Sequence, residues 1–272
     1  MADSKDHTSS PAVTQVIAQL LDRGAVGVVV TVLRGPAIGA KLLIDEHNEV
    51  TGSLGNTELD DLVKTPAAEF LKSHHGTRMF SVSDFAPDFP LASERLLLFE
   101  RLQPAPRLVV CGAGHVGAAL ARLASFVGYQ TTLIDDRAEF VQRSRFPEEQ
   151  IELVVTDDWG TAVRDAIGNG RGVSVAVVTR GHNEDERCMQ AVVRSNPDYT
   201  GLIGSKRRTT IVIDRLREKG ASDEQLKKIH APIGLDIGAI SPEEVALAII
   251  AEIVAVRRGA SGGSLSAWRR KS

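Results

Sequence analysis

Apolar positions in the first hundred residues follow a helical pattern and then several strand patterns. Between positions 11 and 24 they recur on one helix face, with Ser10-Pro11 suited to begin the helix and Gly24 to end it. The runs 25–33, 40–45 and 49–54 are β-rich, and residues 46–48 are suited to a hairpin turn. With a helix over about 58–73 and strands near 78–83 and 94–101, the pattern predicts a small α+β domain, residues 1–102.

The pattern changes after residues 103–106, where two prolines favour extended chain and mark a linker. Short β-branched runs then alternate with helical stretches; these runs are 107–111, 131–135, 151–155, 173–178 and 199–203. This alternation is typical of a parallel sheet covered by helices on both faces. We therefore expect an α/β fold, with a Rossmann-like domain over residues 107–258 after the smaller N-terminal domain. The Gly- and Ser-rich residues 259–272 predict a flexible basic tail.

Composition excludes several classes of protein. The formal net charge of −3 and the aromatic fraction of 4% argue against a basic nucleic-acid binder and against base-stacking platforms. No run approaches the ~18 apolar residues of a membrane-spanning helix, and the first residues lack the pattern of a secretory signal. Cys111 and Cys188 give neither a disulfide framework nor metal-ligand spacing. We expect a cytoplasmic protein that binds neither nucleic acid nor membrane.

The strongest chemical motif is a glycine-rich turn between a predicted strand and a predicted helix. Gly112, Gly114 and Gly117 form a G-x-G-x-x-G pattern in that context. In dinucleotide-binding proteins such glycines permit a tight turn, a close approach of backbone to pyrophosphate, and close packing of helix on strand. Asp135 ends the next strand, about where an acid that binds ribose is expected. These residues predict a Rossmann-type unit, whose turn either binds NAD, FAD or another nucleotide or only permits close packing of helix on strand.

Residues beside this motif leave the ligand open. Asp136 and Arg137 follow Asp135, so the acid that indicates NAD and the arginine that indicates NADP occur together. His115 is either a contact to a phosphate or a proton, or an ordinary residue at the start of a helix. Cys111 is expected in the core.

Two further segments follow predicted strands, at the sheet edge where open α/β sheets bind ligands. His182 is a candidate pocket residue. The acids at 184–186 are suited to a hard cation, but the dipole of the helix they begin explains them better. Ser205 is a candidate helix cap, and the cations Lys206, Arg207 and Arg208 then form either a phosphate site or a solvated face.

A short loop carries the last candidate residue. Asp236 lies between apolar residues and is flanked by Gly234 and Gly238. Such an acid either accepts backbone hydrogen bonds as a structural lock or points into a pocket.

Four segments together resemble the xanthine dehydrogenase accessory family, called XdhC/CoxI. They are VVCGAGHVG, LIDDR, YTGLIGSKRR and HAPIGLDIGAISPEEVALAIIAEI. The resemblance covers residues 107–258 and continues weakly upstream over 39–63. Family members are implicated in binding molybdenum cofactor, in its sulfuration and in its delivery to molybdenum hydroxylases such as xanthine or carbon monoxide dehydrogenases.

The resemblance implies an accessory protein without demonstrable turnover, whose ligand is molybdenum cofactor as molybdopterin or its dinucleotide. The phosphate of that cofactor suits a helix N-terminus, and its cytosine dinucleotide form suits it further. The implied partner is a molybdenum hydroxylase apoenzyme, with a cysteine desulfurase and a homodimer left open. Two alternatives remain: an NAD(P)-dependent oxidoreductase, binding NAD(P) or FAD, and a nucleotide-sensing interaction protein. Against the oxidoreductase, the chain has no Tyr-x-x-x-Lys pair.

The N-terminal segment departs from the family. Family members commonly read G-S-I-G-G-G-C-L-E there, whereas Gly52-Ser53-Leu54-Gly55 is followed by Asn56, Thr57 and Glu58. The thiolate is absent, and a hard carboxylate stands near its position. We therefore expect the cofactor to be held through its phosphate, by the C-terminal half.

Overall fold

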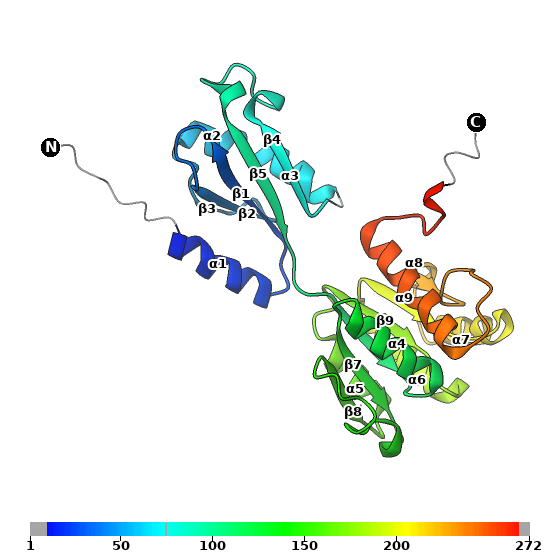
Figure 1. The fold of residues 1–272 in the computed structure, drawn as a ribbon. Coiled ribbons are helices and arrows are strands. Elements are labelled where there is room, and N and C mark those ends of the chain that lie inside the picture. Colours follow the sequence, from blue (N-terminus) through cyan, green and yellow to red (C-terminus); the bar gives the residue numbers. More distant parts are fainter. Residues whose placement is uncertain (1–9, 74, 267–272) are drawn as a thin grey trace. The chain divides into compact units, whose positions relative to one another are not determined.

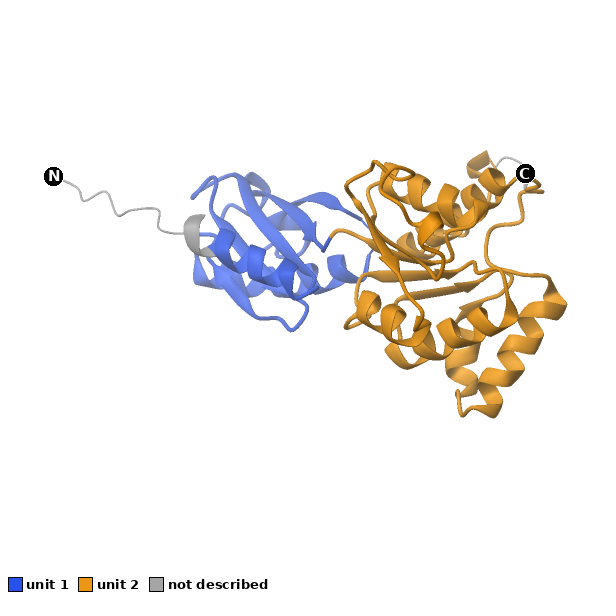
Figure 2. Cartoon of the chain, turned by 90° about the horizontal axis from the view of Figure 1, so that it is seen from below, with its two compact units in different colours: residues 1–104 blue, residues 105–272 orange. Residues whose placement is uncertain are grey.

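The computed structural model describes residues 10–73 and 75–266 of the 272-residue chain (Figure 1). The chain forms two compact units, residues 1–104 and residues 105–272 (Figure 2). Among the described residues, no helix is long and apolar enough to cross a membrane.

Unit 1 is built on an antiparallel sheet with the strand order β3-β2-β1-β5-β4. Alternate residues of β1 face opposite sides of this sheet, as the two-residue period of a strand requires. Val28 and Val30 belong to a core with α2 and α3, whereas Val29 packs with residues of α1. The elements are α1 (Ser10–Asp22), β1 (Gly27–Arg34), β2 (Lys41–Asp45), β3 (Val50–Gly52), α2 (Thr57–Leu62), α3 (Lys64–Lys72), β4 (Thr77–Ser81), β5 (Leu96–Leu102) and the 3₁₀ turns η1 (Val82–Asp84) and η2 (Ala92–Glu94).

The single helix expected over about 58–73 is two helices that meet at Val63. Pro66 explains the break, because its nitrogen has no hydrogen to donate to the carbonyl of Leu62 four residues earlier. Asn56 caps α2, and its side chain accepts a hydrogen bond from the N–H of Leu59 at 2.9 Å. Glu58 lies exposed in the first turn of α2.

Unit 2 is built on a parallel sheet with the strand order β11-β10-β9-β6-β7-β8. Helices cover both faces: α4 and α9 share one core with the sheet, and α5, α6, α7 and α8 share the other. This arrangement confirms the predicted fold class. The elements are β6 (Arg107–Cys111), α4 (His115–Phe126), β7 (Gln130–Asp135), η3 (Ala138–Phe140), β8 (Ile151–Val155), α5 (Trp159–Ile167), β9 (Val173–Val177), α6 (His182–Ser195), β10 (Tyr199–Leu202), α7 (Lys206–Glu218), α8 (Asp223–Lys227), β11 (Ile229–His230) and α9 (Pro242–Arg258).

The connection between β7 and β8 differs from the sequence expectation, because it contains the 3₁₀ turn η3 in place of an α-helix. Arginine side chains here hydrogen-bond to carbonyls of the connection. Arg143 donates to the carbonyl oxygens of Phe146, Glu148 and Ile151 at 2.9–3.0 Å. Such bonds satisfy carbonyl groups that would otherwise need the regular bonding of a helix.

The strand order places a reversal of the chain at β6. From β6 the chain proceeds through β7 to β8, and it then crosses to the opposite side of β6 to form β9. In open α/β sheets, the crevice at such a reversal is where ligands bind, outside the carboxyl ends of the strands.

Two glycines of the turn after β6 differ in the space available for a side chain. A Cβ atom at Gly117 would collide with the carbonyl oxygen of Gly112, whereas a Cβ atom at Gly114 would meet nothing within 4 Å. We expect Gly117→Ala to lower the free energy of unfolding by about 1–3 kcal/mol, and Gly114→Ala to change it by under about 0.5 kcal/mol. Urea unfolding of both variants measures the difference, and equal stability of the two would contradict the close contact.

Candidate functional site

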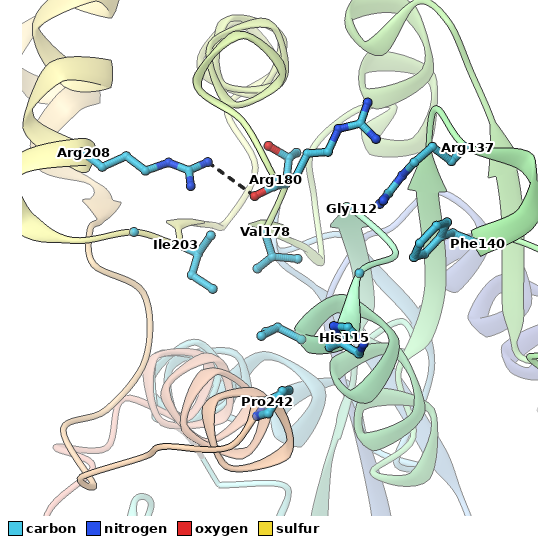
Figure 3. A pocket seen from close by; sticks show the side chains of 13 residues that line it. Gly112, His115, Arg137, Phe140, Val178, Arg180, Ile203, Arg208 and Pro242 are labelled. Carbon is cyan, nitrogen blue, oxygen red and sulfur yellow. Dashed lines mark hydrogen bonds between the residues drawn. The ribbon is translucent and has the colours of Figure 1, made fainter.

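A pocket of about 490 Å³ lies at the reversal of strand order in unit 2 (Figure 3). Its walls come from the segments that follow β6, β7, β9 and β10 and from the first residue of α9. The lining residues are Gly112, Gly114, His115, Val116, Arg137, Phe140, Val178, Thr179, Arg180, Ile203, Gly204, Arg208 and Pro242.

The floor of the pocket is the glycine-rich turn. Gly112 has a φ of +111°, and a Cβ atom there would lie 2.7 Å from the carbonyl oxygen of Val178, so only glycine fits without strain. Gly114 forms the N-cap of α4 and leaves open space in front of its own Cα. The first N–H groups of α4 have no acceptor within the helix, and they carry the positive end of its dipole. The turn is therefore suited to anionic oxygens.

The ionisable side chains that line the pocket are three guanidinium groups and one imidazole. They are His115, Arg137, Arg180 and Arg208, and no carboxylate is among the described lining residues. Each arginine is nevertheless paired with an aspartate that lies outside the lining. The arrangement orients guanidinium groups toward the pocket without adding net charge to the region.

The first pair is Asp135 with Arg137. One oxygen of Asp135 accepts from Nε of Arg137 at 2.8 Å and the other from Nη2 at 3.0 Å. Asp135 also accepts from the N–H of Ala113 at 2.6 Å, in the glycine-rich turn, and from the N–H of Arg137 at 3.0 Å. Burial acts to raise the pKa of Asp135, but these hydrogen bonds outweigh it and hold the pKa below its ordinary value. The hydrogen bond with Asp135 also raises the pKa of Arg137 above its ordinary value.

The second pair is Asp136 with Arg180, and Asp136 also lies near Arg137. Asp136 accepts a hydrogen bond from Nη2 of Arg180 at 2.9 Å, and its other oxygen lies 3.8 Å from Nε of Arg137. Asp136 therefore lies between the two guanidinium groups and keeps both at the same end of the pocket. Burial, followed by its hydrogen bond with Asp135, raises the pKa of Asp136 above its ordinary value.

The third pair is Asp185 of α6 with Arg208 of α7. Asp185 is fully buried, and it accepts from Nη2 of Arg208 at 2.5 Å and from the hydroxyl of Thr179 at 2.5 Å. Burial raises the pKa of Asp185, and the hydrogen bonds from Thr179 and Arg208 oppose that change. The sequence analysis explains the acids at 184–186 by the dipole of their helix, and that explanation does not account for the burial of Asp185.

The predicted site residues divide into three groups. Gly112, Gly114 and His115 line the pocket. Gly117, Asp135 and Asp136 lie behind its wall, where they support the turn or orient an arginine.

The third group lies outside the lining. His182, Lys206 and Arg207 are exposed, and Ser205 caps α7 by accepting from the N–H of Arg208 at 3.3 Å. Asp236 is also exposed. Binding roles for these five residues stay predictions.

The loop around Asp236 is fixed by a different acid. Glu252 of α9 accepts hydrogen bonds from the N–H of Gly234 at 2.9 Å and from the hydroxyl of Tyr199 at 2.5 Å. His230 stacks on Tyr199, with ring centroids 4.6 Å apart, and its Nδ1 lies 3.3 Å from Glu252. Burial and the bond to Glu252 raise the pKa of Tyr199 far above its ordinary value, so the phenol stays a donor.

Sequence reasoning did not assign Phe140 and Arg180 to the site. Both follow strands at the edge that carries the glycine-rich turn, so their position after β7 and β9 was a usable signal. Within the described ranges, no group of three or more His, Cys, Asp or Glu side chains is placed to hold a metal ion.

The burial of Asp185 leads to a stability prediction. We expect Asp185→Ala to lower the free energy of unfolding by about 3–5 kcal/mol, because it leaves the Arg208 guanidinium without its buried partner. Asp214→Ala removes the partner of an exposed pair with Arg217 and is the matched control, expected to cost under about 1 kcal/mol. Urea unfolding measures both, and similar losses would contradict the distinction.

The lowered pKa of Asp135 leads to a pH prediction. Ionised Asp135 stabilises the fold above its ordinary pKa of 3.8, and that contribution is lost as the pH falls through the lowered pKa of the folded state. Asp135→Asn should therefore lose less stability than the wild type between about pH 4 and pH 2. Unfolding midpoints at a series of pH values measure this, and parallel acid limbs would show that Asp135 ionisation contributes nothing.

Comparisons with known proteins agree with this architecture. The Escherichia coli protein YqeB is 34% identical over 158 residues, which cover 58% of this chain and 28% of YqeB. A probable xanthine dehydrogenase subunit from Bacillus subtilis is 27% identical over 60% of this chain and 46% of that protein. The Escherichia coli molybdenum cofactor insertion chaperone PaoD is 27% identical over 57% of this chain and 41% of PaoD. The matches thus span less than half the length of these relatives.

A solved structure and a family model extend the comparison. The crystal structure of a xanthine dehydrogenase from Bacillus halodurans has a TM-score of 0.51 and 17% identity, covering 94% of this chain and 99% of that one, which supports the fold. The family model of the XdhC Rossmann domain matches residues 108–253, more than half of the chain. The chain therefore belongs to the XdhC family.

Proposed function

We propose that this protein binds molybdenum cofactor by its phosphate and supports the maturation of a molybdenum hydroxylase. The observation that carries the proposal is the pocket in which three guanidinium groups and the open N-terminus of α4 converge, with no carboxylate among its described lining residues. Membership of the XdhC family and similarity to a molybdenum cofactor insertion chaperone support the choice of ligand.

The lining residues fit the phosphate end of the cofactor. Guanidinium groups donate several N–H groups in a plane and match phosphate oxygens well. Arg137 and Arg180 lie at one end of the pocket, held by Asp136, and Arg208 lies on the side of α7. The N–H groups at the start of α4 add uncharged donors beside Gly114. When bound, the cofactor would supply its molybdenum chemistry to the recipient enzyme.

Among its described lining residues, the pocket offers no thiolate to the metal end. Cys111 and Cys188 are both fully buried and do not line the pocket. Glu58, which stands near the position of the family cysteine, is a carboxylate and brings no thiolate either. We infer that the protein holds the cofactor by hydrogen bonds and charge. Such a hold is reversible and suits transfer to an apoenzyme, whereas sulfuration would need a separate sulfur donor such as a cysteine desulfurase.

The test is to block the floor of the pocket without unfolding the protein. Gly114→Val places a branched side chain in the open space before the turn, where a phosphate would approach the backbone. We expect binding of molybdenum cofactor, released from a purified molybdenum enzyme, to weaken at least tenfold, or about 1.4 kcal/mol. Pterin retained after anaerobic gel filtration measures the binding.

Gly76→Val is the matched control, because a Cβ atom at Gly76 also meets nothing within 4 Å and Gly76 does not line the pocket. It should bind cofactor as the wild type does. Equal retention by a folded Gly114→Val variant would contradict the proposed site. Nicotinamide-dependent turnover by the wild type, without cofactor retention, would favour the oxidoreductase alternative.

A further inference from the structure

The position that binds ribose in dinucleotide-binding folds has an unusual arrangement here. That position is the acid at the end of the second strand of the unit, and its carboxylate normally accepts from the ribose 2′-hydroxyl. Asp135 occupies it, but both of its oxygens already accept from Arg137 and one also accepts from the N–H of Ala113. Asp135 is 2% exposed and does not line the pocket. A ribose would therefore have to displace Arg137 to reach it.

At this position Arg137 lines the pocket and Asp135 does not. Its guanidinium lies over the ring of Phe140, with the central carbon 3.7 Å from the ring centroid, and both side chains line the pocket (Figure 3). A guanidinium has five N–H groups, and within the described part of the chain two of them donate to side-chain oxygens of Asp135. The remaining N–H groups are available to a ligand, and ring and carboxylate together fix their direction.

Resting on the proposed function, we propose that Arg137 is the specificity-determining residue of this pocket. It selects a ligand that brings a phosphomonoester to the end of β7, and it rejects one that brings an unmodified ribose diol. Arg180 reinforces this selection, because Asp136 holds its guanidinium beside that of Arg137.

The selection follows from the different hydrogen-bonding groups that the pocket offers to a phosphomonoester and to a ribose diol. A phosphomonoester places oxygens against two oriented cations without breaking an existing bond. A ribose diol finds no carboxylate among the described lining residues, and it would leave the donors of Arg137 facing a neutral group. Sites built around fixed polar groups discriminate strongly against ligands that leave those groups unpaired.

For molybdenum cofactor, this selection favours the phosphomonoester form over the dinucleotide form, which carries a ribose diol. The helix N-terminus considered alone favours the dinucleotide form, because it suits a diphosphate.

Two adenine nucleotides isolate the effect of a phosphate at the ribose 2′ position, because both carry the same 5′-phosphate. Adenosine 2′,5′-bisphosphate carries a 2′-phosphate, and adenosine 5′-monophosphate carries the free diol. We expect calorimetric titration of the full chain to give at least tenfold tighter binding of the bisphosphate. A tenfold difference corresponds to about 1.4 kcal/mol. Arg137→Gln should bring the two dissociation constants within about threefold, mainly by weakening the binding of the bisphosphate.

Arg145→Gln is the matched control. Arg145 also lies over the Phe140 ring, at 5.0 Å, and donates to the carbonyl of Phe140 at 3.1 Å, but it does not line the pocket. It should keep the selectivity of the wild type. An equal loss in Arg145→Gln would assign the effect to overall charge and overturn the proposal.

The remaining outcomes separate this inference from the proposed function. Equal affinity of the wild type for both nucleotides, or binding of neither, overturns the role of Arg137. If cofactor retention still depends on Gly114 in that case, the proposed function stands without this selectivity. Loss of both the selectivity and the Gly114 dependence would contradict the two proposals together.

Discussion

The arrangement of the pocket depends on the carboxylate of Asp135. It joins the N–H of Ala113, in the glycine-rich turn after β6, to the side chain of Arg137, after β7. One buried acid thereby fixes the backbone that would receive a phosphate and also the cation nearest to it. The hydrogen bonds more than compensate for the burial of the charge, which is why its pKa lies below the ordinary value.

Pairing each lining arginine with an aspartate solves a conflict between stability and binding. Three unpaired guanidinium groups around one cavity would repel one another and would lack a preferred direction. Asp135, Asp136 and Asp185 remove the repulsion and orient the donors, yet none of them lines the cavity. This support by a second layer of side chains is common where a ligand must meet fixed geometry.

The fold could be predicted from the sequence because its pattern is local. The β-branched runs that became β6, β7, β8, β9 and β10 alternate with helical stretches, and the glycines of the turn stand in the expected context. The site was less accessible to such reasoning. The sequence does not distinguish the three consecutive cations Lys206, Arg207 and Arg208. Successive helix residues point about 100° apart, and of the three only Arg208 lines the pocket. The pairing of Arg137 with Asp135 required knowing which side of the strand end each side chain occupies.

The balance of charge around the pocket also affects how fast a ligand is captured. An anion several ångströms away meets arginine and aspartate in equal number, so the field at long range is weak and diffusional steering adds little to the association rate. Recognition then begins at contact distance, where oriented N–H groups act individually. Affinity in such a pocket is set by the dissociation rate, and a partner that competes for those few hydrogen bonds can take the ligand away.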